Sequence, residues 1–459
     1  MLNLLKNQSN NFKRLIAIID GEHYPQITLD AINVLKNEFD GKFCGIIFLG
    51  GTEKITSGNF NDFFNDEVYA IKDFQKDFLA ALEYFKPDVV YDLSDEPVVN
   101  HLVRMKIASF CFYKKASYMG PDFLFKYEES LYRTINPSIS IIGTGKRIGK
   151  TAISSYIINI FKNSGLEVLV VAMGRGGPRE PQLLKGEEID ITPEYLLSLS
   201  NRGLHASSDY IEDALMSKVT TIGCRRCGGG FGGKVFLSNV VEGTKLADSL
   251  NPDLIILEGS GASLPDAKAD ANICVISASQ DWNDIVGYLG VYRILISEII
   301  ILTNCEKPVA DSKKVKNLED NIKLINPGAR IYKSIFRPQP IGSIENKKII
   351  IAMTAKSIIE DKIKRYIEEN FHCTVIGVTF NLSNRPLLKK DLKSFKNFDT
   401  VLTELKAASV DVVTDFAIKS GKEVIYMNNI PRILNNDKII SKNLKDVYNK
   451  IIKTKQGML

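Results

Sequence analysis

The sequence predicts an α/β protein built on parallel β-sheets, and two observations carry that prediction. Short apolar segments, such as 139–142, 254–257 and 299–303, alternate along the chain with amphipathic segments of helical length. This alternation is typical of parallel strands that are joined by helical crossovers. A glycine-rich segment also separates the apolar segment 139–142 from a helical one, as expected where a strand turns sharply into a helix.

The glycine-rich segment ends in Gly149, Lys150 and Thr151, which is the phosphate clamp of P-loop NTPases. Small residues let backbone N–H groups surround a polyphosphate, the lysine reaches the β- and γ-phosphates, and the threonine hydroxyl binds Mg²⁺. The context agrees, because a helix is expected over 151–163 and Gly165 stands where a C-cap glycine belongs. The expected ATP-binding residues of this loop are Gly143, Thr144, Gly145, Lys146, Arg147, Ile148, Gly149, Lys150 and Thr151.

The loop departs from the strict P-loop spacing, because Thr144 stands where the pattern has glycine and Gly143 comes one residue early. The longer form G-T-x-x-x-x-G-K-T resembles the dethiobiotin synthetase branch of P-loop enzymes. In that branch ATP activates a small molecule instead of driving a mechanical switch. Lys146 and Arg147 add positive charge, and neither falls in the register of the extra lysine of the partition-ATPase relatives.

The order of the expected elements divides the chain into three regions. Residues 1–136 are expected to form an N-terminal α/β, Rossmann-like domain, and residues 137–305 a central P-loop NTPase domain with a parallel sheet. Residues 306–459 are expected to form a smaller C-terminal α/β region. The strands that define these regions are expected over 13–19, 43–49, 88–92, 139–142, 167–173, 254–257, 272–277, 299–303, 347–353, 373–379 and 423–426.

Composition narrows the function classes. With 459 residues, 44% hydrophobic and 25% charged, the chain is expected to be a soluble globular protein of two or three domains. No apolar run approaches the ~20 residues of a membrane span, and the N-terminal segment lacks a signal-peptide core. The net charge of +5 suits an acidic substrate, and no basic run is long enough to indicate nucleic acid. Seven scattered cysteines, an odd number, favour a reducing cytoplasm.

A second motif follows the P-loop in the sequence. Four apolar residues over 254–257 run into Glu258, and the segment Gly-Ser-Gly follows up to Gly261. This is the Walker B arrangement, in which a strand delivers a carboxylate to the sheet edge beside the P-loop, where it holds Mg²⁺ directly or through water. The alternative is a strand that merely ends in a turn.

Two glycine- and arginine-rich segments are expected to be loops that bind anions. The first, MGRGGPREP over 173–181, carries Arg175 and Arg179, and each guanidinium can grip phosphate oxygens with two donors. The second, GCRRCGGGFGGK over 223–234, offers Arg225, Arg226 and Lys234 among glycines whose N–H groups can form a nest. The alternative for either segment is a flexible surface loop.

Two further features stay open at this point. Cys224 and Cys227 form a C-x-x-C motif. A structural zinc site needs four ligands, and no second cysteine pair lies nearby. We therefore expect the two cysteines to be small residues that shape the loop, and we do not favour a zinc or redox role. Asp209 is the best candidate for a second metal ligand, with helix capping as the alternative. The roles of the two cysteines and of Asp209 therefore stay hypotheses.

The N-terminal region has a polar cluster of its own. His23 lies in the segment DGEHYP over 20–25, where the first expected strand ends, and Arg104 follows the acidic segment over 91–97. Strand ends of a parallel sheet are the usual ligand edge. This edge could bind a metal or hydroxyl groups, or it could serve helix N-capping, and we include His23 and Arg104 among the candidate substrate-binding residues.

Together, GTGKRIGKT, MGRGGPREP, GCRRCGGGFGGK and LEGSGAS resemble the corresponding motifs of the cyclic 2,3-diphosphoglycerate synthetase family, an archaeal family of about this length. FRPQPIG (336–342) and TELKAASVDVVTDFA (403–417) resemble its C-terminal part. The resemblance implies an ATP-dependent ligase that closes 2,3-bisphosphoglycerate into a ring through an intramolecular phosphoanhydride, with ATP and Mg²⁺ as cofactors. Neither nucleic acid nor membrane is an expected partner, and a homodimer is expected.

The resemblance also implies roles for the candidate residues. Lys150 would act on the β- and γ-phosphates, and Asn304 resembles the base-contacting asparagine of related enzymes. The metal ligands would be Thr151, Glu258 and Asp209. The catalytic residues would be Lys150, Arg175, Arg179, Arg225 and Arg226. The same four arginines and Lys234 would bind the substrate, together with His23 and Arg104.

Two other function classes remain. A nucleotide-driven switch or metallochaperone would share the P-loop, although a switch needs no dedicated small-molecule pocket. A ligase of the dethiobiotin synthetase type, acting on a carboxylate or amine, is the second alternative.

Overall fold

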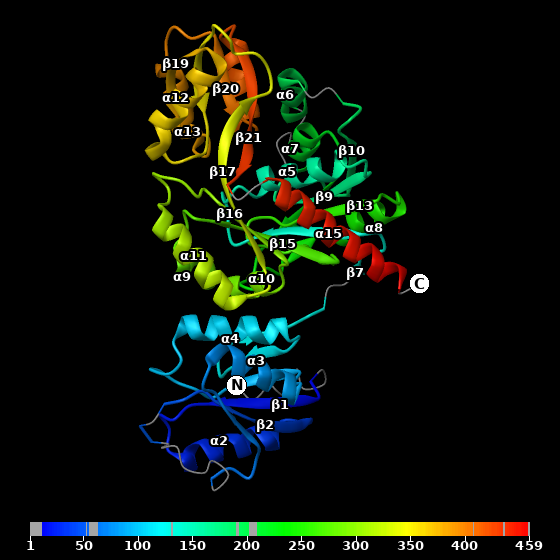
Figure 1. Ribbon diagram of the computed structural model, residues 1–459, viewed down its shortest axis with the longest axis vertical. Coiled ribbons are helices and arrows are strands. Elements are labelled where there is room, and N and C mark those ends of the chain that lie inside the picture. The colour runs from blue at the N-terminus through cyan, green and yellow to red at the C-terminus, as the bar shows by residue number, and fades with distance from the viewer. Residues whose placement is uncertain are drawn as a thin grey trace. The chain divides into compact units, whose positions relative to one another are not determined.

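The structure, a computed structural model, describes residues 12–51, 53–54, 63–129, 132–189, 192–201, 209–406, 408–434 and 437–457. The chain divides into two compact units (Figure 1). The smaller unit takes in residues 1–129, 281–296 and 324–327, and the larger unit takes in the rest. Each unit is described by itself below.

The smaller unit is built on a six-stranded sheet in the order β3-β2-β1-β4-β5-β6, in which only β6 pairs antiparallel. Because the chain starts in the middle, moves to β2 and β3, and then crosses to β4, the strand order reverses between β1 and β4. Ligands of open α/β sheets bind at such switch points. The strands are β1 (Arg14–Ile19), β2 (Lys42–Phe48), β3 (Val68–Ala70), β4 (Val89–Asp92), β5 (Ser117–Met119) and β6 (Leu124–Phe125).

Local signals begin the helices of this unit. The side chain of Asp73 caps α3 and that of Asn100 caps α4, while a proline opens α2. Two short helices from the middle of the sequence also belong here, and the ring of Tyr292 packs at 5.8 Å against Phe112 of α4. The helices are α2 (Pro25–Glu38), α3 (Phe74–Phe85), α4 (His101–Tyr113), α9 (Trp282–Val286) and α10 (Gly290–Leu295).

The larger unit contains one 13-stranded sheet in the order β10-β11-β9-β13-β8-β15-β16-β17-β21-β20-β18-β19, with β12 paired to β11. From β11 to β17 every pair is parallel. The α/β fold class with parallel sheets, predicted above, is therefore confirmed. The strands of the first half are β8 (Ser138–Gly143), β9 (Val168–Gly174), β10 (Gln182–Lys185), β11 (Thr220–Cys227), β12 (Leu237–Ser238), β13 (Leu254–Glu258), β15 (Ala271–Ser277) and β16 (Ile299–Thr303).

The sheet continues across the expected boundary at 305/306. Strand β17 (Arg330–Pro340) pairs parallel with β16 through its first residues and antiparallel with β21 (Glu423–Ile433) through the rest. The two expected domain boundaries, at 136/137 and 305/306, stay predictions. The remaining strands are β18 (Lys348–Ala352), β19 (Thr374–Thr379), β20 (Thr400–Glu404) and the pair β7 (Tyr132–Arg133) and β14 (Ala267–Lys268).

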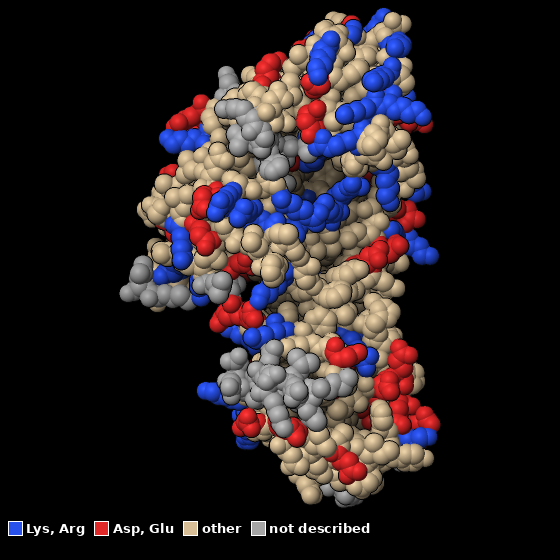
Figure 2. Space-filling model, turned by 180° about the vertical axis from the view of Figure 1, so that it is seen from behind, with Lys and Arg blue, Asp and Glu red and all other residues tan. Residues whose placement is uncertain are grey.

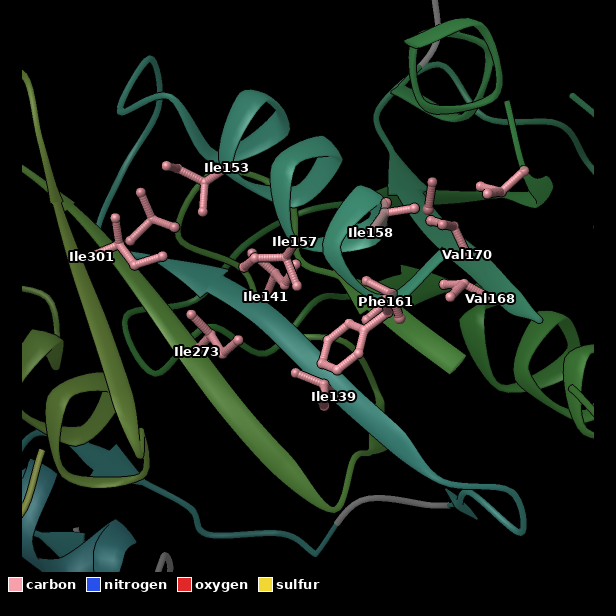
Figure 3. Close-up of a cluster of buried hydrophobic side chains, with 14 of the residues drawn as sticks. Ile139, Ile141, Ile153, Ile157, Ile158, Phe161, Val168, Val170, Ile273 and Ile301 are labelled. Atoms are coloured by element: carbon pink, nitrogen blue, oxygen red, sulfur yellow. The ribbon is translucent and has the colours of Figure 1, made fainter. Parts of the chain in front are cut away.

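The core of the larger unit lies between the sheet and helix α5 (Lys150–Lys162). Figure 3 shows Ile153, Ile157 and Phe161 of this helix pointing toward Ile139 and Ile141 of β8. All five side chains are fully buried, and each contributes about 1.5–3 kcal/mol when taken out of water. This packing fixes the start of α5, and with it the glycine-rich loop, at the carboxyl edge of the sheet.

The other helices of the larger unit cover the sheet faces or follow its C-terminal strands. None of the helices in the described part of the chain has the length and apolar character that a membrane crossing needs. The expected homodimer and cytoplasmic location stay predictions. The helices are α6 (Pro193–Asn201), α7 (Asp209–Ser217), α8 (Val240–Ser249), α11 (Ser312–Ile325, whose end belongs to the smaller unit), the 3₁₀ turn Ser357–Ile359, α12 (Glu360–Phe371), α13 (Arg385–Ser394), the π-helix Ser409–Thr414, α14 (Asp415–Lys419) and α15 (Asp437–Gln456).

Candidate functional site

The glycine-rich loop connects β8 to α5 and is held from both sides. The N–H of Thr144 donates to the carbonyl of Val275 at 3.3 Å, and the Thr303 hydroxyl donates to the carbonyl of Ile148 at 2.7 Å. Gly149 caps α5 with a φ of +83°, and a Cβ there would overlap the ring of Phe336 on β17. The loop therefore ends directly at a helix N-terminus, where unbonded N–H groups and the helix dipole favour a phosphate.

Lys150 and Glu258 meet at the carboxyl edge of the sheet. Strand β13 lies between β8 and β9, and its last residue, Glu258, is paired with Ile141 on one side and Ala172 on the other. The Lys150 ammonium donates a hydrogen bond to the carbonyl of Gly259, the residue after Glu258. The two predicted motifs are therefore adjacent in space, and the Glu258 carboxylate is 3% exposed.

The donor groups at this edge suit Mg²⁺. Thr151 offers a hydroxyl on the first turn of α5, and Glu258 offers a carboxylate. Among the described residues there is no cluster of three or more His, Cys, Asp or Glu that could hold a metal alone. Mg²⁺ usually takes one or two protein oxygens and completes its shell with waters and substrate phosphates, so the pair fits it. Asp209 is the first residue of α7, but its side chain lies outside the described residues.

Basic side chains from three segments surround Gly261, which follows the Glu258 turn and has a φ of +63°. A Cβ at this position would lie 3.5 Å from Lys146 Cγ, 3.8 Å from Arg175 Nη2 and 3.8 Å from Arg226 Nη2. We call Gly261 with these three side chains the Gly261 cradle. It joins the P-loop to both arginine segments, which lie far apart in the sequence, and its positive charge suits an anion.

The second arginine segment is not a loop throughout, as the sequence had suggested. Residues up to Cys227 belong to β11, which pairs parallel with β9 and antiparallel with β12, so the loop begins only at Gly228. Because side chains alternate along a strand, Arg225 and Arg226 point to opposite faces. The prediction that the whole segment 223–234 is a loop is wrong, because strand pairing of its first residues outweighs the glycine content.

The two arginines also differ in their contacts. The Arg226 guanidinium, 7% exposed, donates to the carbonyl of Gly228 at 2.8 Å and to the carbonyl of Ser260 at 2.9 Å, so it holds the turn that follows Glu258. For Arg225, Nε is buried without a hydrogen-bond acceptor among the described residues. An oxygen anion would satisfy this donor, whose burial is otherwise costly.

Arg179 and Lys234 are exposed at the margin of this region. The backbone carbonyl of Arg179 accepts a 3.0 Å hydrogen bond from the Asn239 side chain, a residue that the sequence reasoning did not single out. Burial raises the pKa of the Asp266 carboxyl group, and the nearby positive charge of Lys234 acts in the opposite direction. Both cations remain candidate phosphate ligands.

Asn304 follows β16 and has a φ of +57°. Its Nδ2 donates to the hydroxyl of Ser277 at the end of β15, at 2.8 Å. Nearby, Gln280 Oε1 accepts hydrogen bonds from the Thr144 hydroxyl at 2.8 Å and from the Ser277 N–H at 3.2 Å. Gln280 thus links the P-loop to the Asn304 region, and the base-contacting role of Asn304 stays a prediction.

His23 and Arg104 belong to the smaller unit, at the switch point between β1 and β4. His23 Nδ1 lies 3.1 Å from Asp20 Oδ1, and Arg104 Nε donates to Asp92 Oδ2 at 3.2 Å. Both carboxylates are buried and also accept hydrogen bonds from backbone N–H groups, those of Glu22 and Asp95 to Asp20 and that of Ser94 to Asp92. The cluster therefore has a structural role, and the substrate-binding role stays a prediction.

Cys224 and Cys227 point to opposite faces of β11, because they are three residues apart in a strand. Cys224 is fully buried in an apolar cluster, and burial raises the pKa of its thiol to about 12, so it is not a thiolate at neutral pH. Cys227 is exposed. One tetrahedral ion needs thiolates that converge on it.

We therefore expect purified protein to hold no stoichiometric zinc. The double variant Cys224→Ala, Cys227→Ser is expected to keep at least roughly half of the wild-type turnover, because alanine keeps the buried position apolar. Metal analysis by mass spectrometry and a turnover assay would check both. One zinc per chain that disappears in the double variant would contradict this expectation.

The surface around the hollow of the larger unit is basic. Figure 2 shows a row of Lys and Arg side chains that runs beside a hollow on this face. A concave, positively charged surface raises the local concentration of anionic substrates. Together with the Gly261 cradle, this favours a multiply charged phosphate compound as the ligand.

Comparisons with known proteins agree with the sequence motifs. Models of the cyclic 2,3-diphosphoglycerate synthetase family match residues 14–126 (N-terminal domain), 138–335 (P-loop domain) and 340–430 (C-terminal domain). Proteins named cyclic 2,3-diphosphoglycerate synthetase are 43% identical in Methanothermus fervidus (92% of this chain, 94% of the relative), 45% in Thermococcus onnurineus (91% and 94%) and 41% in Rubrobacter xylanophilus (91% and 94%).

Among solved structures, the hydrogenase maturation factor HypB from Archaeoglobus fulgidus covers 44% of this chain and 82% of its own at 16% identity. Its TM-score of 0.29 is too low to carry an argument. The family models and the relatives span nearly the whole chain, and the resemblance stated from the motifs is confirmed. The chain therefore belongs to the cyclic 2,3-diphosphoglycerate synthetase family.

Proposed function

We propose that this enzyme uses ATP to close 2,3-bisphosphoglycerate into cyclic 2,3-diphosphoglycerate, with release of ADP and inorganic phosphate. The observation that carries the proposal is the Gly261 cradle, in which Lys146, Arg175 and Arg226 surround a glycine next to the P-loop. The names of the relatives support the identity of the product. A nucleotide alone would occupy the P-loop, whereas a second phosphorylated substrate needs the additional cations.

The reaction joins two phosphate groups that repel each other. In a first step, an oxygen of one substrate phosphate attacks the γ-phosphorus of ATP, the bond from that phosphorus to the bridging oxygen breaks, and ADP leaves. In a second step, an oxygen of the other substrate phosphate attacks the activated inner phosphorus. The ring P–O–P bond forms, and the outer phosphoryl group leaves as inorganic phosphate.

Both attacking oxygens are anionic before they react, so the site needs no general base. What it must supply is charge neutralisation and alignment of the reacting groups. Lys150, at the P-loop, would neutralise the β- and γ-phosphates. The cradle side chains would hold the substrate phosphates, and Arg225 would donate its unsatisfied Nε–H to a phosphate oxygen.

Thr151 and Glu258 would hold Mg²⁺, which when bound neutralises part of the charge on the phosphate oxygens. The burial of Glu258 limits the access of water to its carboxylate and so strengthens its attraction to a cation.

The direct test is ³¹P NMR of the purified protein with ATP, Mg²⁺ and 2,3-bisphosphoglycerate. Cyclisation converts two phosphomonoester signals into phosphoanhydride signals while ADP and inorganic phosphate accumulate in equal amounts. ATP hydrolysis that is independent of 2,3-bisphosphoglycerate would favour a switch. Turnover with a carboxylate or amine substrate and no anhydride signal would favour a ligase of the dethiobiotin synthetase type.

We expect Arg175→Gln to raise the KM for 2,3-bisphosphoglycerate far more than the KM for ATP. Loss of one charge-assisted contact to phosphate costs about 1.5–3 kcal/mol, which corresponds to roughly tenfold to a hundredfold in affinity. Arg175→Lys should recover only part, since an ammonium cannot make the planar two-point contact. Steady-state kinetics with each substrate varied in turn would measure both constants.

The matched control is Arg365→Gln, which removes another exposed arginine, on α12 of the same unit. It should leave both constants within about twofold of wild type, because an isolated surface charge contributes little. If Arg175→Gln raises the KM for ATP and leaves that for 2,3-bisphosphoglycerate unchanged, the cradle binds the nucleotide instead.

A further inference from the structure

The side chain of Asn239 connects the two arginine segments. Its Nδ2 donates to the carbonyl of Pro178 at 3.2 Å and to the carbonyl of Arg179 at 3.0 Å, both in the loop after β9. Its Oδ1 accepts from the N–H of Arg225 on β11 at 2.7 Å. A side-chain amide carries two N–H donors and an acceptor oxygen, so Asn239 satisfies two carbonyls of one segment and the N–H of the other at once.

The position of Asn239 in the sequence suggests a different role. It is the N-cap residue of α8, where asparagine normally accepts a hydrogen bond from the second or third helical N–H. Asn100 of α4 and Asn384 of α13 do this. Asn239 makes no such bond, while the hydroxyl of Ser238 accepts from the first helical N–H at 3.1 Å. The amide group is thus used for the loop instead of the helix.

The loop that Asn239 holds lies directly on β11. A Cβ at Gly177 would overlap the carbonyl of Cys224 and would lie 2.8 Å from Arg225 Cα, so the two backbones are in contact. This loop carries Arg175, whose guanidinium takes part in the Gly261 cradle. Without a fixed loop, the Arg175 side chain would have to be ordered when the substrate binds, at the cost of binding free energy.

We propose that Asn239 is a positioning residue that fixes the loop of Arg175 and Arg179 against β11 and so aligns the arginines for the substrate phosphates. This inference rests on the proposed function for its substrate, but the contacts of Asn239 do not depend on it. Asn239 acts through the arginines, because all three hydrogen bonds of its side chain go to backbone atoms of the two segments.

The test uses Asn239→Asp in the full-length protein. Aspartate keeps the acceptor for the Arg225 N–H and is an equally good helix N-cap, but it places a carboxylate against two carbonyl oxygens. We expect the KM for 2,3-bisphosphoglycerate to rise roughly tenfold, with the KM for ATP within about twofold of wild type. Asn239→Ser, which replaces the two amide donors by a single hydroxyl on a shorter side chain without adding charge, should act in the same direction.

The second measurement is the rate of tryptic cleavage after Arg175 and Arg179, which reports on the loop without any substrate. We expect it to rise in both Asn239 variants and to stay at the wild-type rate in the control Asn384→Asp, in which a true N-cap asparagine is changed. Cleavage at the wild-type rate in both Asn239 variants would overturn the proposal, and so would an equal rise of both KM values.

Failure of the proposed function has a separate signature. If wild-type protein forms no cyclic product from 2,3-bisphosphoglycerate, the substrate assignment is wrong and the proteolysis result alone decides on Asn239. Faster cleavage in its variants then still supports the positioning role, and unchanged cleavage overturns it.

Discussion

Lys150→Ala is expected to lower ATP-dependent turnover by at least roughly a thousandfold while the protein stays folded. The lysine stands at the start of α5, where its ammonium reaches the carbonyl of Gly259 beside Glu258. As the bond between the γ-phosphorus and the bridging oxygen breaks, negative charge develops on the departing ADP, and alanine cannot neutralise it. Loss of one partly exposed hydrogen bond costs only about 1 kcal/mol of stability.

The control for this variant is Lys162→Ala at the other end of the same helix, where the ammonium donates to the carbonyls of Ser217 and Lys218. It should keep the wild-type turnover number. ADP release at saturating substrates and thermal unfolding would be measured for both variants. A folded Lys150→Ala protein whose turnover lies within about tenfold of wild type would refute the P-loop assignment.

The features that the sequence predicted well are those with a local cause. An apolar segment followed by a glycine-rich turn and an amphipathic segment defines β8, the P-loop and α5 within about 25 consecutive positions. The same holds for β13 and Glu258, because a buried strand that ends in an acid and two glycines is recognisable without its neighbours. Parallel pairing of β13 with β8 then brings the two motifs together.

Segment 223–234 shows where local reasoning fails. Its glycine content predicts a loop, yet Cys224 to Cys227 extend β11. Cys224 and Arg225 continue the ladder with β9, and Arg226 and Cys227 pair with β12. A partner about fifty residues away is not visible in the local pattern. The strand changes the candidate site, because it directs Arg225 and Arg226 to opposite faces and allows Arg226 to donate a hydrogen bond to the carbonyl of Ser260.

The sequence patterns also do not predict residues that contact the motifs from distant parts of the chain. Phe336 against Gly149 and Gln280 against Thr144 are contacts between distant segments of the sequence. Asn239 occupies the N-cap position of α8, but its side chain bonds the loop after β9 instead of the helix, and no local pattern predicts those contacts. Helices α9 and α10 belong to the smaller unit because they pack against α4. No pattern in residues 281–296 predicts this packing.

Glu258→Gln is expected to slow turnover by about two orders of magnitude or more and to raise the Mg²⁺ concentration needed for half-maximal activity roughly tenfold. The amide is isosteric with the carboxylate, so the buried position at the end of β13 stays filled, and removal of a buried charge lowers the cost of desolvation. The loss should therefore appear in the metal dependence and not in the melting temperature.

Two measurements separate a metal ligand from a structural acid at this position. Turnover would be recorded against Mg²⁺ for wild type, for Glu258→Gln and for the control Glu298→Gln, which changes a partly exposed glutamate that lies just before β16 and forms an ion pair with Lys450. The control should match wild type, because exposed ion pairs contribute little. If Glu258→Gln is slow but keeps the wild-type Mg²⁺ titration, the carboxylate acts by orienting Lys150 and the P-loop, and the metal is held by Thr151 and the phosphates alone.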